Sequence, residues 1–262
     1  MREQVFVKTD KSGARKKYYY GAGIIIGVIV IIIGTGMYFY YWSPVLRIGE
    51  FTINGTNSKD EARVAIVNYF NSSRSFFSPA TDRIVFWTQH NDESIESPSF
   101  LPYAASIKFV SNFTEKKVVA EITPRVMSGV WCVSEKCYVF DNNGIIFSEA
   151  PDVSGSLILK IRDENNTQVT LGSAVLSGGE FESIKKAIKS VQQNKIPISE
   201  ILIQNIELKE WAAVAPNGFS IRFSFNSIPE DLDSVFKGIL ERTSIEKLTY
   251  IDLRIPNRVY FK

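Results

Sequence analysis

Residues 18–42 read YYYGAGIIIGVIVIIIGTGMYFYYW and decide how the rest of the chain is organised. No charged side chain interrupts them, and residues 24–33 hold seven isoleucines, two valines and one glycine. Residues 18–41 measure about 36 Å as an α-helix, longer than a hydrocarbon core of roughly 30 Å. Aromatic residues at both ends are typical of the two membrane interfaces. The sequence therefore predicts a transmembrane helix over residues 18–42.

Basic residues are concentrated on one side of this segment. Arg47 is the one basic residue that follows it closely. Six precede it: Arg2, Lys8, Lys11, Arg15, Lys16 and Lys17. This asymmetry predicts a cytoplasmic tail over residues 1–17, a single span, and an extracytoplasmic remainder. A cleaved secretory signal is the alternative, but the long apolar run and the bulky aromatic residues after it favour an uncleaved anchor.

Small residues form a stripe along the predicted span. Gly23 and Gly27 make a GxxxG pair, and Gly34 returns near the same face at helical periodicity. Such a stripe lets a second helix approach closely, so we expect helix packing at these three glycines. The alternative is that they reflect the general frequency of glycine in membrane helices.

The composition argues against several classes of function. The chain has 262 residues, with 30 basic and 28 acidic side chains. Residues 1–17 hold six basic and two acidic residues, a local net charge of +4. The whole chain has a net charge of +2, so residues 18–262 sum to −2. This remainder lacks the excess of basic residues that a nucleic-acid binder needs. One histidine and two cysteines leave little material for a metal site. Since no hydrolase or phosphate-binding motif occurs, we expect no catalytic residue, metal, cofactor or small-molecule substrate.

Residues 45–124 have the pattern of a small α+β domain. The expected elements are a strand over 46–53 with a bulge at Gly49-Glu50, a helix opened by a capping box at 58–61, an extended segment at 83–87, a weak helix within 88–100, and a hairpin of strands 105–109 and 117–122. Alternating apolar residues make the hairpin the clearest of these features.

Residues 125–262 change to many short strands. The pattern predicts strands at 126–131, 138–140, 145–147, 157–161, 169–174, 200–206, 211–215, 219–225, 249–254 and 259–261. Amphipathic helices are expected to begin at Ser177 and at Pro229. We expect a mainly antiparallel β domain with two flanking helices, so the whole chain is assigned to the α+β class.

Two short patterns in this second region have structural interpretations. Cys132 and Cys137 lie on the arms of a predicted hairpin, and an extracytoplasmic setting favours a disulfide between them over free thiols or a functional pair. Asp252 and Arg254 stand two apart on a strand, so they are expected to form an ion pair on the sheet surface.

The end of the sequence predicts an exposed strand. Val259-Tyr260-Phe261 is short, apolar and flanked by Arg258 and Lys262. A strand without a second neighbour is either protected by charges or used to pair with another chain. The alternative is an edge covered by its own domain.

Several short motifs, in this order and spacing, resemble those of one family. They are residues 46–58, LRIGEFTINGTNS; residues 117–131, KVVAEITPRVMSGVW; residues 139–147, VFDNNGIIF; and residues 250–254, YIDLR. Together with the basic tail and the single span, they resemble the FtsQ/DivIB family of bacterial division proteins. The chain differs from the family in having Ile122 where an arginine is usual, and in its two cysteines.

The resemblance implies a scaffold in the bacterial plasma membrane at the division septum. It implies that residues 45–124 are a POTRA domain, and that the β domain holds small bitopic coiled-coil proteins of the FtsB/DivIC and FtsL type, which regulate septal peptidoglycan synthesis. The family's edge-strand site corresponds here to Ile255, Asn257, Val259, Tyr260 and Phe261. Other hypotheses for this sequence are a POTRA-bearing component of an export or envelope-assembly complex, and a membrane-anchored envelope hydrolase.

Overall fold

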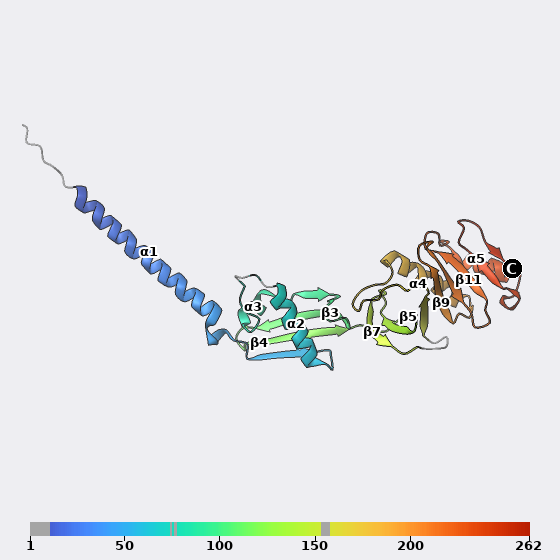
Figure 1. Ribbon diagram of the computed structural model, residues 1–262, viewed down its shortest axis with the longest axis horizontal. Helices are drawn as coiled ribbons and strands as arrows, with labels where there is room; N and C mark the ends of the chain where they lie inside the picture. The colour runs from blue at the N-terminus through green and yellow to red at the C-terminus, as the bar shows by residue number, and fades with distance from the viewer. Residues whose placement is uncertain (1–10, 74, 76–77, 153–157) are drawn as a thin grey trace, which may run out of the picture. The chain divides into compact units, whose positions relative to one another are not determined.

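The computed structural model describes residues 11–73, 75, 78–152 and 158–262, with side chains from residue 23 onward. The first ten residues of the predicted basic tail therefore lie outside the described residues. Helices and strands are mixed along the chain, which confirms the α+β class (Figure 1). The chain divides into two compact units: residues 1–53, 67–93 and 109–120 form the first, and residues 54–66, 94–108 and 121–262 form the second.

Helix α1 (Lys11–Trp42) contains the predicted membrane segment. Its part from Gly23 to Trp42 is 20 residues long, has a mean hydropathy of 2.2 and buries none of its residues against the protein. The isoleucines of its centre are exposed, Ile24 by 69% and Ile31 by 68%. One N-terminal helix is thus long and apolar enough to cross a membrane, as the sequence predicted. A 3₁₀ turn (Pro44–Leu46) follows it, and the first strand begins at Glu50 rather than at the predicted residue 46.

A four-stranded sheet has the order β1-β4-β3-β2. Its elements are β1 (Glu50–Asn54), α2 (Lys59–Ser73), α3 (Ile84–Gln89), β2 (Ser94–Glu96), β3 (Ala104–Asn112) and β4 (Lys117–Pro124). In β4 the buried residues Val118, Ala120 and Ile122 alternate with more exposed ones, which confirms the predicted hairpin strand. Gly55 ends β1 with a φ of +86°, and a Cβ there would lie 1.8 Å from the Ile122 carbonyl oxygen, so this turn requires glycine.

The prediction for residues 83–100 is wrong in both of its parts. Residues 84–89 form helix α3 rather than an extended segment. The segment after it, where a weak helix was expected, forms strand β2 instead. Ile84 and Trp87 are fully buried, and the Trp87 ring lies 5.3 Å from Phe70 and 5.2 Å from Phe109, centroid to centroid. Packing of these large side chains outweighs the strand preference of aromatic and β-branched residues.

A nine-stranded sheet has the order β13-β12-β11-β10-β9-β8-β5-β6-β7. Its strands are β5 (Gly129–Val133), β6 (Lys136–Phe140), β7 (Ile146–Ala150), β8 (Leu159–Asp163), β9 (Glu200–Asn205), β10 (Glu210–Val214), β11 (Ser220–Ser224), β12 (Tyr250–Asp252) and β13 (Tyr260–Phe261). Helices α4 (Gly178–Gln193) and α5 (Leu232–Leu240) accompany it, and a 3₁₀ turn (Ile245–Lys247) precedes β12. Figure 1 shows both helices against this sheet.

One hydrophobic core joins the sheet to its two helices. Ile161, Ile201 and Ile221 contribute from the strands, and Ile184 and Phe236 from the helices, each fully buried. The predicted capping box of α4 is confirmed, because the Ser177 and Glu180 side chains each accept a hydrogen bond from the other's backbone N–H. The core fixes the strand order that brings β12 and β13 to one end of the sheet.

The nine-stranded sheet is more mixed than the mainly antiparallel arrangement that the sequence predicted. Within the described residues five of its strand pairings are antiparallel, whereas β5–β8, β8–β9 and β11–β12 are parallel. The strand expected at 169–174 is not formed; Ala174 makes only an isolated bridge to Ile145. Helix α5 begins at Leu232 rather than at Pro229, because the Asp231 side chain accepts from the Ser234 N–H and caps the helix there.

Candidate functional site

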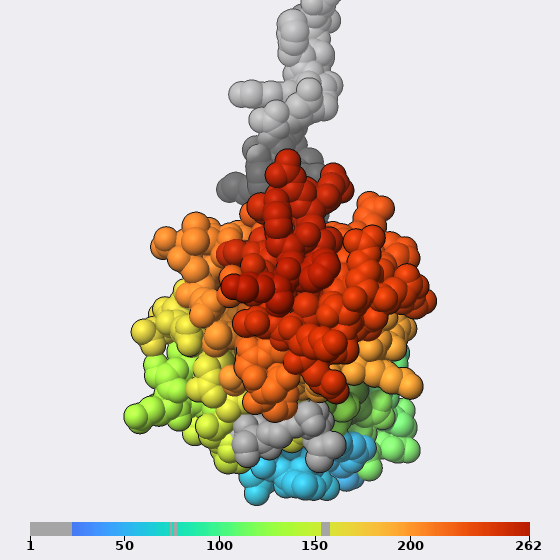
Figure 2. Space-filling model, turned by 90° about the vertical axis from the view of Figure 1, so that its right-hand side faces the viewer, coloured from blue at the N-terminus to red at the C-terminus, as the bar shows by residue number. Residues whose placement is uncertain are grey.

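The predicted edge strand lies at one end of the nine-stranded sheet. Among the described residues β13 pairs with β12 alone, so its other side is open. Val259, Tyr260 and Phe261 are exposed by 37%, 45% and 39%. Figure 2 shows the end of the chain, in the deepest red, uncovered on the face turned to the viewer. A short apolar strand is therefore available to another chain.

Some backbone hydrogen-bonding groups of β13 face β12, and others face the open side. The Lys262 N–H donates to the Tyr250 carbonyl at 3.2 Å, and the Tyr250 N–H donates to the Lys262 carbonyl at 3.3 Å. Asp252 lies opposite Tyr260. The pair of Ile251 and Phe261 lies between the Tyr250–Lys262 pair and the Asp252–Tyr260 pair. Because hydrogen-bonded and non-hydrogen-bonded pairs alternate in an antiparallel ladder, the N–H and C=O of Phe261 point away from β12. The N–H is a ready donor and the C=O a ready acceptor for an added strand.

The two faces of β13 differ in chemistry. Phe261 shares the face of buried Ile251, and Tyr260 shares the face of Asp252. Near Tyr260, the Arg222 guanidinium lies 5.0 Å from the centre of the Tyr250 ring. A strand added here would meet an apolar side chain on one face and a phenol with nearby cations on the other.

Arg254 holds the end of β12 in place. Its Nε and Nη2 donate to the two oxygens of Asp252, at 3.0 and 2.6 Å, and its Nη1 donates to Glu210 on β10 at 2.7 Å. Hydrogen bonds from Arg254 lower the pKa of the Asp252 carboxyl; burial opposes this and the Arg222 charge adds to it. The same contacts raise the pKa of Arg254. The predicted Asp252–Arg254 ion pair is confirmed, while the part played by Glu210 had no signal in the sequence.

We expect this anchor to weaken in acid. Because the pKa of folded Asp252 lies below the usual 3.8, its stabilising contribution is complete above that pH and is lost as the pH falls below it. The Asp252→Asn variant is expected to show a smaller loss of melting temperature between pH 5 and pH 2 than the native chain, measured by circular dichroism. Equal losses in both proteins would contradict this role.

The remaining residues of the predicted partner site lie just before β13. Ile255 and Asn257 belong to the loop between β12 and β13, and Ile255 is 49% exposed. Asn257 has a φ of +59°, and the Arg258 N–H donates to the Ile255 carbonyl at 3.2 Å, which closes the turn. The structure thus brings the five predicted residues together in one loop and strand. Their binding of a partner stays a prediction.

The three glycines predicted for helix packing lie on α1. A Cβ built at Gly23, Gly27 or Gly34 would meet no atom within 4 Å. Within the part of the chain that is described, this stripe is accessible to a second helix. Packing of such a helix on it stays a prediction.

The two cysteines face each other across the β5–β6 hairpin and are bonded. Cys132 and Cys137 form a disulfide with their Cα atoms 4.0 Å apart, as predicted. Both are buried beside Val130. The Asp152 carboxylate lies within 4.8 Å of the sulfurs, but sulfurs joined in a disulfide are not thiolate ligands, so this group does not form a metal site.

Removing the disulfide is expected to loosen the hairpin without unfolding the chain. The bond closes a loop with a sequence separation of 5 residues. Its contribution is therefore smaller than the ~3 kcal/mol of a fifteen-residue loop. The Cys132→Ser/Cys137→Ser chain should keep its circular dichroism spectrum and melt at a lower temperature. An unfolded spectrum at 25 °C would show that the bond contributes far more.

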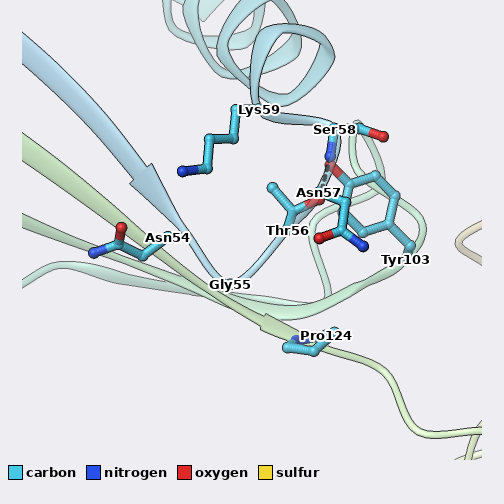
Figure 3. A pocket seen from close by; sticks show the side chains of 8 residues that line it. All are labelled: Asn54, Gly55, Thr56, Asn57, Ser58, Lys59, Tyr103 and Pro124. Atoms are coloured by element: carbon cyan, nitrogen blue, oxygen red, sulfur yellow. Dashed lines mark hydrogen bonds between the residues drawn. The ribbon is translucent and has the colours of Figure 1, made fainter.

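Two other places bring polar side chains together. The side chain of His90 is 25% exposed. Its ring centroid lies 4.5 Å from that of Phe86, and its Nδ1 is 3.6 Å from the Glu93 carboxylate. A depression of about 730 Å³ is lined by residues 54–59, Tyr103 and Pro124 (Figure 3). Its side chains offer amides, hydroxyls and one amine without a nucleophile–base pair, so we assign it no reaction.

Comparison with known proteins identified no family for the chain. No protein-family model matches it. No curated protein matches it at a significant level.

Proposed function

We propose that this chain is a non-enzymatic, bitopic scaffold of the bacterial division machinery. In this proposal α1 spans the plasma membrane with the basic tail in the cytoplasm. The four-stranded sheet belongs to a POTRA-like domain, and the nine-stranded sheet to a partner-binding β domain. The partners are small bitopic proteins of the FtsB/DivIC and FtsL type, through which the scaffold coordinates septal peptidoglycan synthesis.

The open edge of β13 is the observation that carries this proposal. Its outward backbone groups at Phe261 suit β-augmentation, in which main-chain hydrogen bonds give affinity and side-chain contacts give specificity. Bitopic partners in the same membrane would be confined near it, which raises their effective concentration. A scaffold needs a docking surface of this kind rather than a catalytic site.

The motifs that resemble the division family lie on ordered elements, and this supports the proposal. Residues 117–124 form β4, residues 139–147 run from β6 through a turn into β7, and residues 250–252 form β12 beside the edge strand. The Asp141 carboxylate, in the motif at 139–147, accepts from the Asn143 and Ile145 N–H groups at 2.9 and 3.0 Å, which explains an aspartate before this turn.

Affinity capture and imaging test the proposal. The full-length chain, captured from crosslinked membranes of its own cells, is expected to bring down small bitopic coiled-coil proteins, and a chain lacking residues 255–262 is expected to lose them. A fluorescent fusion is expected to concentrate at division sites. Capture without septal placement would favour an export or envelope-assembly complex, and turnover of wall or peptide bonds by the purified chain would favour an envelope hydrolase.

A further inference from the structure

The last turn of α1 is bonded to the folded body. Tyr40 lies two residues before Trp42, the end of the helix, and its hydroxyl accepts from the Gln89 Nε2 of α3 at 3.2 Å. Arg83, whose side chain is 6% exposed, donates to the Ser43 carbonyl just after the helix. Two residues of a helix correspond to about 3 Å, so the C-terminal end of α3 lies close to the end of the apolar segment.

The tip of the β3–β4 hairpin is attached to this same end of the unit. The Asn91 Oδ1 accepts from the Ser111 N–H at 2.7 Å, and the Ser111 hydroxyl donates to the Trp87 carbonyl at 3.2 Å. On the other side of the tip, the Gly49 N–H donates to the Lys116 carbonyl at 2.8 Å. The hairpin tip is thus held on one side by Trp87 and Asn91, which flank Gln89, and on the other by Gly49, seven residues after the end of α1.

This tip presents an aromatic side chain to its surroundings. Phe113 is 53% exposed, and Val110 on the same hairpin is 37% exposed. The turn is ordered, since the Glu115 N–H donates to the Asn112 side chain at 3.1 Å and the Lys116 N–H donates to the Phe113 carbonyl at 3.3 Å. An exposed phenylalanine on a fixed turn, which hydrogen bonds connect to residues near the end of an apolar helix, fits the membrane interface better than water.

We infer that residues 112–116 dock on the outer leaflet of the membrane, with Phe113 at the boundary between head groups and acyl chains. The inference depends on the span given to α1 in the proposed function. The lipid need not be anionic, because the nearby Lys117 pairs with Glu50 at 3.3 Å and Arg47 lies 3.9 Å from Asp82. This contact would fix the unit against the bilayer at two places, the helix and the hairpin tip.

Depth-dependent quenching tests the contact in the full-length chain. Both native cysteines are in the disulfide, so an added cysteine gives one reactive thiol. An environment-sensitive fluorophore is attached to one of three single-cysteine variants, Thr114→Cys, Thr123→Cys or Ile29→Cys. Each labelled chain is placed in phosphatidylcholine nanodiscs. The lipid carries a quencher either near the head group or deep in the acyl chain. Thr114 and Thr123 are both exposed, and Thr123 lies further along β4, about 20 Å from its start at 3.4 Å per residue.

The head-group quencher is expected to quench the Thr114 label at least about threefold more than the Thr123 label, consistent with burial of about 5–10 Å into the interface. Replacing Phe113 by serine is expected to remove this difference, and since Phe113 is exposed, the change breaks no core contact. Equal quenching at Thr114 and Thr123 would overturn the inference. Failure of the deep quencher to reach Ile29 would instead refute the span itself.

Discussion

Replacing Phe261 by proline is expected to weaken partner capture strongly while leaving the nine-stranded sheet folded. Proline lacks the N–H that Phe261 directs away from β12, and an added strand would then bury an unpaired carbonyl. The hydrogen bonds between β13 and β12 at Lys262 and Tyr250 do not use the Phe261 amide. A buried unpaired group costs about 1–3 kcal/mol, so affinity is expected to fall roughly tenfold to a hundredfold.

Phe261→Leu is the matched control, because it keeps the N–H and a branched apolar side chain. It is expected to retain most of the capture, which is measured by quantitative pull-down of the full-length chain from crosslinked membranes. Melting curves of both variants would verify that the sheet is intact. Capture by Phe261→Pro at the native level would exclude main-chain docking at this edge, and equal losses in the two variants would assign the binding to the aromatic ring.

Short-range patterns predicted the elements that depend on local sequence. The alternation in β3 and β4 identified their hairpin, and the Ser177–Glu180 box identified the start of α4. The edge strand was predicted because Val259-Tyr260-Phe261 ends an apolar pattern with charged residues on both sides. In each case the residues that carry the signal are neighbours in the chain.

Features that depend on distant contacts were not predicted. Helix α3 forms because Trp87 packs in one aromatic cluster with Phe70 and Phe109. The local sequence of residues 83–87 carries no signal of these distant partners. The strands of the parallel pairs β8–β9 and β11–β12 are separated in the chain by α4 and α5, respectively. This strand–helix–strand order is typical of a parallel crossover, which the mainly antiparallel prediction did not include. Glu210 completes the Arg254 anchor from 44 residues away.

A buried ion pair between Arg125 and Asp141 is expected to produce the largest stability effect in this chain. The Arg125 side chain is 1% exposed and that of Asp141 is 8% exposed, with 2.5 Å between Nη1 and Oδ2. The Arg125 Nε also donates to the Pro102 carbonyl at 2.9 Å. Arg125→Met would leave the Asp141 carboxylate buried without its cation, and removing one partner of such a pair costs about 3–5 kcal/mol.

The second partner supplies the control that separates charge from packing. Asp141→Asn keeps an oxygen for the Asn143 and Ile145 N–H groups but removes the charge. The Arg125→Met/Asp141→Asn chain is therefore expected to be more stable than Arg125→Met alone, since it has no unpaired buried carboxylate. Urea unfolding of the full-length chain in detergent, followed by near-ultraviolet circular dichroism, measures all three variants. If the two single losses simply add in the double variant, the pair contributes through packing around each residue rather than through its charges.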